Sequence, residues 1–282
     1  MSLIKKHHNK NNYYLTKTGF WVRDFTKSAK AEDINKLISP SDYDLLLENE
    51  LSNATLNIAN IDSETIYSPN VVIVSDGYDF EKKQQMLKNL SQQKVTIVGV
   101  NRSLVKWKMP RRMDWYVVNN PYQECMAMLP SHAYYPRCIA SVRTNPDFIK
   151  RYRGRLGVVY KYNPTPDRNF SSNYTFPPVY HIDDYRNPIC AAISIAYHWE
   201  VQKLLLFCCD DSFDKERSGS EKLDNGLWQY PQQRISHGLI EGCLHWLSSQ
   251  QNIKVKIANH SAGAEYKCAS YISEEDILNF FD

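Results

Sequence analysis

The stretch Arg186–Phe213, RNPICAAISIAYHWEVQKLLLFCCDDSF, decides the fold of this chain. It contains a helical pattern over Cys190–Trp199 and then Lys203–Cys209, which is apolar after its first residue, as a strand buried on both faces requires. A helix followed by such a strand is typical of a parallel α/β sheet. Two carboxylates, Asp210 and Asp211, follow the strand directly. Because ligands bind outside the carboxyl ends of strands in open α/β sheets, this position predicts a functional site.

From Val71 onward, short β-branched runs alternate with helical patterns, which predicts an α/β domain with a mostly parallel sheet and helices on both faces. The expected strands are Val71–Val74, Val95–Val100, Asp114–Val118, Ile139–Val142, Val158–Tyr160, Lys203–Cys209 and Lys254–Ile257. The expected helices are Phe80–Leu90, Cys190–Trp199, Pro231–Leu247 and Ser273–Phe281. Residues 1–66 are polar, with a helix-like piece around Ala31–Leu51, and are expected to form an N-terminal extension packed on a core of residues 67–282.

Composition and charge are typical of a soluble, cytoplasmic protein without a membrane partner. The net charge is only +3, so affinity for nucleic acid would need a local basic patch. The charged start MSLIKKHHNKNN is not followed by an apolar segment, and no later run reaches the ~20 apolar residues of a membrane span. Seven scattered cysteines without a C-x-x-C pair favour buried free thiols over disulfides or zinc. Homo-oligomerisation is left open.

Polar turns follow the first two expected strands. Ser75-Asp76-Gly77-Tyr78 lies between a strand and a helix, where backbone N–H groups can receive a phosphate, although an ordinary turn is as consistent with a single glycine. Asn101-Arg102 ends the next strand, and an amide beside a guanidinium suits a nucleobase, a ribose or a diphosphate. Alone, such a pair is more often part of a solvated loop.

The two adjacent carboxylates and one histidine are candidates for catalysis. Asp210 or Asp211 could hold a cation, orient a sugar hydroxyl or act as a base, and adjacent strand residues point to opposite sides, so one of them is expected to face the site. The alternative is a helix-capping Asp with a solvated neighbour. His260 follows the last expected strand and is placed for acid–base chemistry, although loop histidines are often bystanders. No histidines have metal-ligand spacing, so no metal site is predicted.

A compact basic run and several missing motifs complete the picture. Lys150–Arg155, KRYRGR, could grip the phosphates of a nucleotide donor or of a nucleic-acid backbone, although a solvated helix end explains it equally well. The sequence has no G-x-S-x-G elbow, P-loop or complete G-x-G-x-x-G. Serine hydrolases, P-loop kinases and standard dinucleotide dehydrogenases are therefore disfavoured.

Taken in order, these pieces resemble the Rossmann-like family described as 6-hydroxymethylpterin pyrophosphokinase-like, which also contains the Maf-type flagellin glycosyltransferases and is distantly similar to bacterial sialyltransferases. The matching segments, VVIVSDGYDF, TIVGVNRSL, MPRRMDWYVV and AAISIAYHWEVQKLLLFCCDDSF, agree in order and spacing over about residues 70–260. Gly77 matches the second glycine of the family's first turn, Asn101 its nucleotide-binding asparagine and Asp114 its third-strand aspartate. Asp210 matches the late aspartate, while Cys208 replaces the family's glycine.

The resemblance implies a Rossmann-like transferase that uses a nucleotide-activated donor, a glycosyltransferase with a nucleotide sugar and a hydroxyl acceptor on protein, glycan or DNA. It favours Asp210 over Asp211 as the residue that faces the site. Mg²⁺ is a possible companion of the donor. The resulting site predictions are Asp210 and His260 as catalytic residues, and Ser75, Asp76, Gly77, Asn101, Arg102, Asp114, Asn119, Arg143, Asn187 and Asp211 for the substrate or nucleotide. The alternatives are an ATP-dependent pterin-type pyrophosphokinase and a non-catalytic binding module.

Overall fold

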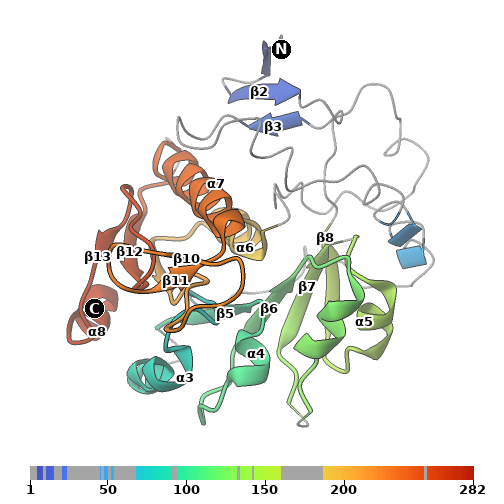
Figure 1. Ribbon diagram of the computed structural model, residues 1–282, viewed down its shortest axis with the longest axis horizontal. Helices are drawn as coiled ribbons and strands as arrows, with labels where there is room; N and C mark the ends of the chain where they lie inside the picture. The colour runs from blue at the N-terminus through green and yellow to red at the C-terminus, as the bar shows by residue number, and fades with distance from the viewer. Residues whose placement is uncertain are drawn as a thin grey trace.

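The computed structural model describes residues 68–90, 94–131, 134–141, 143–159, 187–250 and 253–282, with short pieces among the first 53 residues. Its centre is an eight-stranded sheet in which every neighbouring pair of strands is parallel (Figure 1). The strands are β4 (Asn70–Val74), β5 (Thr96–Val100), β6 (Trp115–Val118), β7 (Arg137–Ser141), β8 (Leu156–Val159), β9 (Lys203–Phe207), β12 (Lys256–His260) and β13 (Ser270–Tyr271). The fold class that the sequence predicts is confirmed.

The order of the strands across the sheet is β13-β12-β9-β4-β5-β6-β7-β8. The chain moves from β4 through β5 and β6 in one direction and later returns to place β9, β12 and β13 on the other side of β4. The six strands in the order β13-β12-β9-β4-β5-β6 therefore have the arrangement of a doubly wound dinucleotide-binding sheet. Two further strands, β7 and β8, extend this sheet beyond β6. The direction of winding reverses between β4 and β9, and the crevice outside their carboxyl ends is where such sheets bind ligands.

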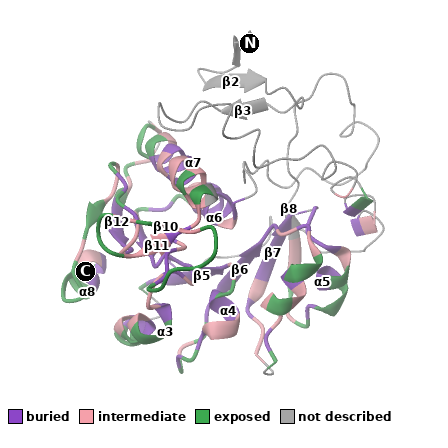
Figure 2. Cartoon of the chain, viewed as in Figure 1, coloured by how far each residue is buried: buried purple, intermediate pink, exposed green. Residues whose placement is uncertain are grey.

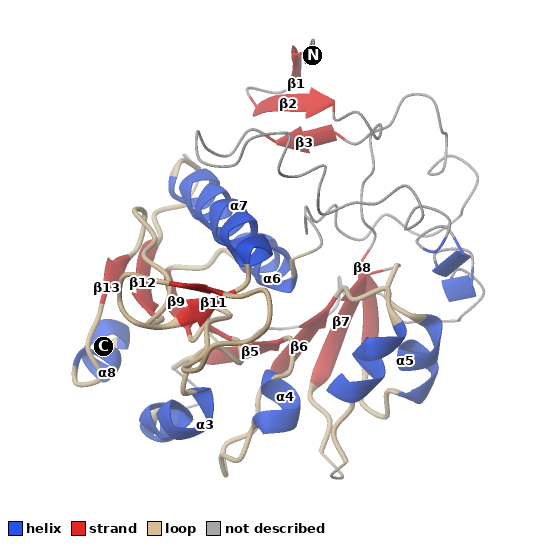
Figure 3. Cartoon of the chain, viewed as in Figure 1, coloured by secondary structure: helices blue, strands red, loops and turns tan. Residues whose placement is uncertain are grey.

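Helices cover both faces of the sheet (Figure 3). One face carries α6 (Pro188–His198) and α7 (Pro231–Ser248), which pack on alternate strand residues such as Val71 and Ile73. Val72 and Val74 face the opposite layer. That layer holds α3 (Phe80–Lys83), the 3₁₀ turn η2 (Gln84–Asn89), α4 (Ser103–Lys106), η3 (Gln123–Met128), α5 (Pro146–Arg151) and α8 (Asp276–Phe281). The central strands are thus buried on both sides (Figure 2).

The longest helices begin where their sequences allow it. Asn187 caps α6 by accepting a hydrogen bond from the N–H of Ile189 at 2.8 Å, and Pro188 occupies the first turn, where its missing N–H costs nothing. α7 also has a proline, Pro231, in its first turn. None of the described helices is long and apolar enough to cross a membrane.

Several elements differ from the expectation. The pattern over Phe80–Leu90 forms α3 and then η2, so it is partly 3₁₀ rather than a single α-helix. The sequence pattern did not indicate β13 or the small hairpin of β10 (Glu221–Lys222) and β11 (Trp228–Gln229), because two-residue strands carry no detectable alternation.

All seven cysteines are free, and all but the partly exposed Cys268 are buried.

The N-terminal residues are described only in part. β1 (Lys5–His8), β2 (Asn11–Leu15) and β3 (Trp21–Arg23) form a separate antiparallel sheet. Most of the helix-like piece expected around Ala31–Leu51 lies outside the described residues. Asn49 and Asn53 donate side-chain hydrogen bonds to the backbone carbonyls that follow β6 and β7, so this part of the chain contacts the core. The division at residue 66 stays a prediction.

Candidate functional site

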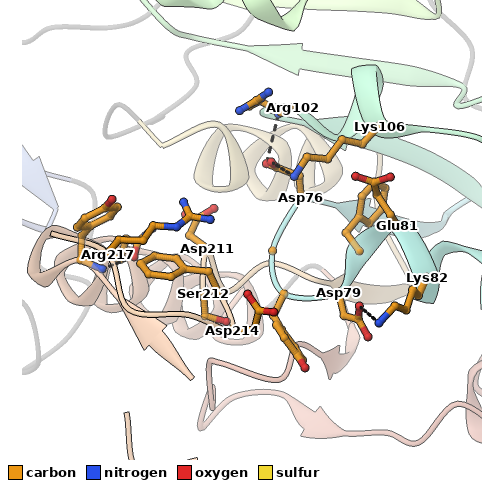
Figure 4. A pocket seen from close by; sticks show the side chains of 16 residues that line it. Asp76, Asp79, Glu81, Lys82, Arg102, Lys106, Asp211, Ser212, Asp214 and Arg217 are labelled. Carbon is orange, nitrogen blue, oxygen red and sulfur yellow. Dashed lines mark hydrogen bonds and ion pairs between the residues drawn. The ribbon is translucent and has the colours of Figure 1, made fainter. Parts of the chain in front are cut away.

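A pocket of about 450 Å³ lies outside the carboxyl ends of β4 and β9, at the point where the winding of the sheet reverses. Its walls come from the turn after β4, from the turn after β5 and α4, from the loop after β9, and from the start of α7. Figure 4 shows Asp211, Ser212 and Arg217 on one side and Asp76, Arg102 and Lys106 on the other. The lining residues are Asp76, Gly77, Tyr78, Asp79, Phe80, Glu81, Lys82, Arg102, Lys106, Asp211, Ser212, Phe213, Asp214, Arg217, Tyr230 and Gln233.

Asp210 lies beneath this pocket and joins the loops that build it. Its carboxylate is fully buried and accepts hydrogen bonds from the N–H of Tyr78 at 3.0 Å and from the N–H of Gly263 at 2.6 Å. Its carbonyl oxygen accepts from Nε2 of His237 on α7 at 2.8 Å. Hydrogen bonds from backbone N–H groups to one buried carboxylate hold the donating loops in place around it. This geometry fits a positioning role rather than direct contact with a substrate.

The turn Ser75–Tyr78 does not offer the phosphate cradle that its position suggests. The N–H of Ser75 donates to the carbonyl of Phe207 at 3.1 Å, and that of Gly77 donates to the carbonyl of Cys208 at 3.0 Å. The N–H of Tyr78 is taken by Asp210. A Cβ atom on Gly77 would lie 2.5 Å from the carbonyl oxygen of Cys208 and closer still to the Asp210 carboxylate. Glycine is needed here because the protein's own carboxylate, not a ligand, approaches the turn.

Asp211 is the carboxylate that lines the pocket. The preference for Asp210, which the resemblance implied, differs from this arrangement: Asp210 is buried and does not line the pocket, and Asp211 follows in a left-handed backbone conformation with φ 49°. The catalytic role expected of Asp210 stays a prediction. Burial, and then the nearby charges of Asp76 and Asp210, raise the pKa of Asp211 to about 7. A carboxyl group that titrates near neutral pH can take or give a proton under physiological conditions.

The pocket also contains cations, some of them already paired. Nζ of Lys106 lies 3.0 Å from the carboxylate of Asp76, which also accepts from the backbone N–H of Arg102 at 3.3 Å (Figure 4). Lys82 pairs in the same way with Asp79 at 3.2 Å. Arg217 extends over the ring of Phe213, with 4.1 Å from its guanidinium carbon to the ring centroid. Arg102 and Arg217 thus bring two guanidinium groups to the pocket that form no ion pair with the described residues.

Asn101 supports the pocket from behind. Its backbone is left-handed, with φ 53°, and its side-chain N–H donates to Oγ of Ser75 at 3.1 Å. Its carbonyl accepts from the hydroxyl of Tyr116 at 2.6 Å. Asn101 and Ser75 therefore connect the turns after β4 and β5, and neither is among the residues that line the pocket.

His260 is placed away from the pocket. It ends β12 on the face that carries α8, where its ring stacks between Phe207 and Tyr271 at centroid distances of 5.4 and 5.8 Å. Its Nδ1 contacts the carbonyl of Ile272 at 2.9 Å, and burial lowers its pKa. The catalytic role expected of His260 finds no support in this position. His237, which the sequence pattern did not single out, is the histidine that contacts the site through Asp210.

Asp114 lies at the amino ends of the strands, on the opposite side of the sheet from the pocket. It precedes β6, and its carboxylate accepts from the N–H of Ile97 at 2.8 Å and from the guanidinium of Arg111 at 3.3 Å. Ile97 is near the amino end of β5, whereas the pocket lies beyond the carboxyl ends. Asp114 thus lies away from the pocket, and its expected role in nucleotide binding stays a prediction.

Three further predicted residues lie at the carboxyl side but outside the pocket lining. Asn119 follows β6 and Arg143 follows β7, and both are buried. Asn187 caps α6 and also donates to Oγ of Ser236 on α7. None of these three is among the residues that line the pocket. Their expected contact with a nucleotide stays a prediction.

The sequence pattern missed some of the lining residues. Arg217 and Asp214 belong to the polar segment after β9, and Tyr230 and Gln233 belong to the start of α7. The only signal for them was the general polarity of residues 211–228, which did not indicate individual side chains. Among the described residues, no three His, Cys, Asp or Glu side chains converge as a set of metal ligands.

The sequence matches no protein-family model and no curated protein sequence. Among solved structures, the chain is similar to the Maf glycosyltransferase from Magnetospirillum magneticum AMB-1, with a TM-score of 0.57 and 12% sequence identity. The two share a fold. The match covers 83% of this chain and 39% of that chain, so this chain corresponds to well under half of the larger protein. The resemblance to Maf proteins is supported at the level of fold, and the links to pyrophosphokinases and sialyltransferases stay predictions.

Cys208, which stands where the resemblance places a glycine, adopts a left-handed backbone with φ 52°. Glycine adopts this conformation without strain, while for other L-residues it costs about 1 kcal/mol or more. The backbone at this position therefore has a conformation that favours glycine.

Proposed function

We propose that this protein is a transferase of the glycosyltransferase type, which binds a nucleotide-activated sugar in the pocket between the ends of β4 and β9. The observation that carries the proposal is the combination, in one pocket, of a carboxyl group with a pKa of about 7, Asp211, and two guanidinium groups, Arg102 and Arg217. Transfer from such a donor needs a base for the acceptor and positive charge for the leaving group. The fold shared with a Maf glycosyltransferase agrees with this assignment.

In the proposed reaction, Asp211 removes the proton of an acceptor hydroxyl while the oxygen of that hydroxyl attacks the anomeric carbon of the sugar. The bond between that carbon and the phosphate oxygen of the nucleotide breaks, and the phosphate leaves with the bonding electrons. Arg102 and Arg217 stabilise the negative charge that develops on it, which is usually the largest catalytic contribution in such reactions. Asp210 holds the three loops in register through Tyr78 and Gly263.

The size and apolar parts of the pocket are compatible with this donor. A volume of about 450 Å³ is within the range of small-molecule sites, ~300–1,000 Å³. Phe213 and Tyr230, with ring centroids 5.3 Å apart, provide apolar surface for a nucleobase or for the face of a sugar. The acceptor is a hydroxyl group on protein, glycan or DNA.

The segment after Asp211 is proposed to close over the bound donor. It forms a hairpin whose base is fixed by two backbone hydrogen bonds between Phe213 and Trp228, of 2.8 and 2.9 Å. Gly219 and Gly226 have left-handed backbones, and a side chain on either would meet nothing within 4 Å. An exposed hairpin with a fixed base can move as a unit and exclude water from the reaction.

The test combines donor binding with turnover. UDP-, CMP-, GDP- and ADP-linked sugars are screened by thermal shift, since a ligand that binds the native state raises the melting temperature. With the donor that binds, Asp211→Asn should retain binding and lose ~100- to 10,000-fold in the rate of donor cleavage. The wild-type rate should rise with pH through about 7, because the base must be deprotonated. Asp214→Asn, a change of an exposed pocket carboxylate, serves as the matched control and should keep most of the activity.

Other outcomes would assign another function. Stabilisation by ATP with Mg²⁺ and by no sugar donor would favour the pyrophosphokinase. If no nucleotide changes the melting temperature, the binding-module alternative replaces both enzymes. Equal activity of Asp211→Asn and wild type would remove Asp211 from the reaction.

A further inference from the structure

The basic run Lys150–Arg155 is not part of the pocket. In the structure it lies near other arginines at the amino ends of the strands, whereas the pocket lies at their carboxyl ends. It covers the end of α5 and the residues that enter β8 at its amino end. Arg137 begins the neighbouring strand β7, and the N–H of Cys138 donates to the carbonyl of Arg155 at 2.8 Å, which places these two arginines side by side. Arg112 precedes β6, the next strand.

Tyrosines connect these three segments. The hydroxyl of Tyr152 donates to the carbonyl of Pro136 at 2.7 Å, and its ring meets the ring of Tyr135 edge-on at 5.0 Å. The hydroxyl of Tyr134 donates to the carbonyl of Met113, and the guanidinium of Arg112 lies over the Tyr134 ring at 4.4 Å. These contacts connect the segments before β6, β7 and β8, so their cations lie at the same end of three neighbouring strands.

Gly154 allows the close approach. A Cβ atom there would lie 2.6 Å from the carbonyl oxygen of Pro136 and 2.7 Å from Cε1 of Tyr152. Without a side chain, residues 153–155 can lie directly against residues 135–136. The side chains of Arg153 and Arg155, on either side of the glycine, remain exposed.

The charge of this region is far from that of the whole chain. Residues 111–114, 134–137 and 150–155 contain six arginines and one lysine against one aspartate, a net charge of +6, whereas the whole chain carries +3. The aspartate, Asp114, is buried against Arg111. We call the remaining cations the arginine surface: Arg112, Arg137, Lys150, Arg151, Arg153 and Arg155. All of them are exposed except Arg137, which is partly exposed. Lys150 and Arg151 also stabilise the end of α5, and the guanidinium of Arg137 lies over the ring of Trp115, 5.4 Å from its centroid.

We propose that the arginine surface binds the phosphate backbone of a nucleic acid, without reading its sequence. Closely spaced guanidinium groups match phosphates in geometry and charge, and Tyr134 and Tyr135, both partly exposed beside them, offer rings on which a base can stack. A membrane surface fits less well, because it would need exposed apolar side chains beside the cations. In the described part of the chain the exposed large apolar residues are Tyr271 and Leu278, on β13 and α8 at the other end of the sheet (Figure 1).

The proposal is independent of the function assigned to the pocket, because the arginine surface lies at the amino ends of the strands. It is tested by fluorescence anisotropy of the full chain with a labelled random DNA duplex and a single strand, each of about 20 nucleotides, at several salt concentrations. With four phosphate contacts, affinity should fall ~100-fold between about 50 and 200 mM salt. The double variant Arg151→Glu/Arg153→Glu should bind at least ~10-fold more weakly, with a smaller salt dependence.

The matched control is the double variant Lys88→Glu/Lys267→Glu, which makes the same charge change at exposed lysines outside the arginine surface. It should lose clearly less affinity than the arginine variant, and both should keep the wild-type melting temperature. Absence of binding at about 50 mM salt, or equal losses in the two variants, would overturn the proposal. Binding to vesicles with anionic lipid, or to polyglutamate, but not to either nucleic acid would also overturn it.

Discussion

The two ends of the strands differ. At the carboxyl ends, around the pocket, charged groups are buried and several residues have strained backbones. At the amino ends of β6–β8, most charged side chains are exposed to solvent. Four of the five non-glycine residues with left-handed backbones in the described part follow β4, β5 or β9 at the carboxyl edge: Asp79, Asn101, Cys208 and Asp211. Each such residue costs about 1–2 kcal/mol. Strain of this kind persists where the surrounding structure fixes it, and it gathers at functional sites.

This difference shows which end of the strands has side chains suited to catalysis. At the carboxyl edge a buried carboxylate, Asp210, orders three loops, and its neighbour Asp211 has a pKa near neutrality. At the amino ends of β6–β8, Asp114 pairs with the largely buried guanidinium of Arg111, and most of the other arginine side chains are exposed. The first arrangement suits proton transfer, and the second suits attraction of a polyanion.

The largest expected effect concerns the turn that approaches Asp210. Gly77→Ala would force a Cβ atom against the Asp210 carboxylate and the Cys208 carbonyl, so the free energy of unfolding should fall by about 3 kcal/mol or more. Urea unfolding measures this. Gly219→Ala is the matched control, because a side chain there meets no atom within 4 Å and pays only for its left-handed backbone, about 1 kcal/mol. Equal losses in the two variants would show that the carboxyl edge is less tightly built than described.

The next effect separates the two aspartates that the sequence assigned to one site. Asp114→Asn removes the charge that pairs with the largely buried guanidinium of Arg111 and should lower the free energy of unfolding by about 2 kcal/mol. Donor binding should not change, because Asp114 lies at the far edge. Asp224→Asn, at an exposed position, should leave stability unaltered. A variant that folds as well as wild type but no longer binds the donor would restore Asp114 to the nucleotide site.

The smallest effect is a pH dependence of stability that comes from Asp211. Its pKa is about 7 in the folded protein and near 4 in the unfolded chain, so the folded state binds the extra proton between these values. This contribution to stability is therefore present below about pH 4 and is lost as the pH rises to 7. Asp211→Asn should be more stable than wild type at pH 8, by ~1 kcal/mol for a partly exposed carboxyl. Thermal unfolding of both proteins at pH 5 and pH 8 measures the difference, and parallel curves would contradict the assigned pKa.

The sequence was sufficient for the sheet apart from β13, because buried parallel strands are continuous apolar runs that can be recognised without a partner strand. The predicted strands Lys203–Cys209 and Val95–Val100 correspond in this way to β9 and β5. The turn positions were also found, since residues such as Asn101 and Asp211 directly follow those strands. The expectation that ligands bind at strand ends therefore pointed to the end of the sheet where the pocket lies.

The roles of individual side chains could not be derived from the sequence. Whether Asp210 or Asp211 faces outward depends on a left-handed backbone at Cys208 and Asp211, which reverses the simple alternation of a strand. The sequence placed Asp114 at the start of an expected strand, next to the observed β6, and its role in nucleotide binding came from the resemblance alone. His237 contacts the site across tertiary structure, through the Asp210 carbonyl, and no local pattern indicates such a contact.

The most direct test of the central claim is hydrogen–deuterium exchange of the full chain with and without the nucleotide sugar that gives the largest thermal shift. The account predicts slower exchange in peptides that cover residues 76–82 and 211–217, on the two sides of the pocket, and unchanged exchange in the peptide that covers residues 150–155. Protection confined to the arginine surface, or no protection around the pocket, would contradict the assignment of the carboxyl edge of β4 and β9 as the donor site.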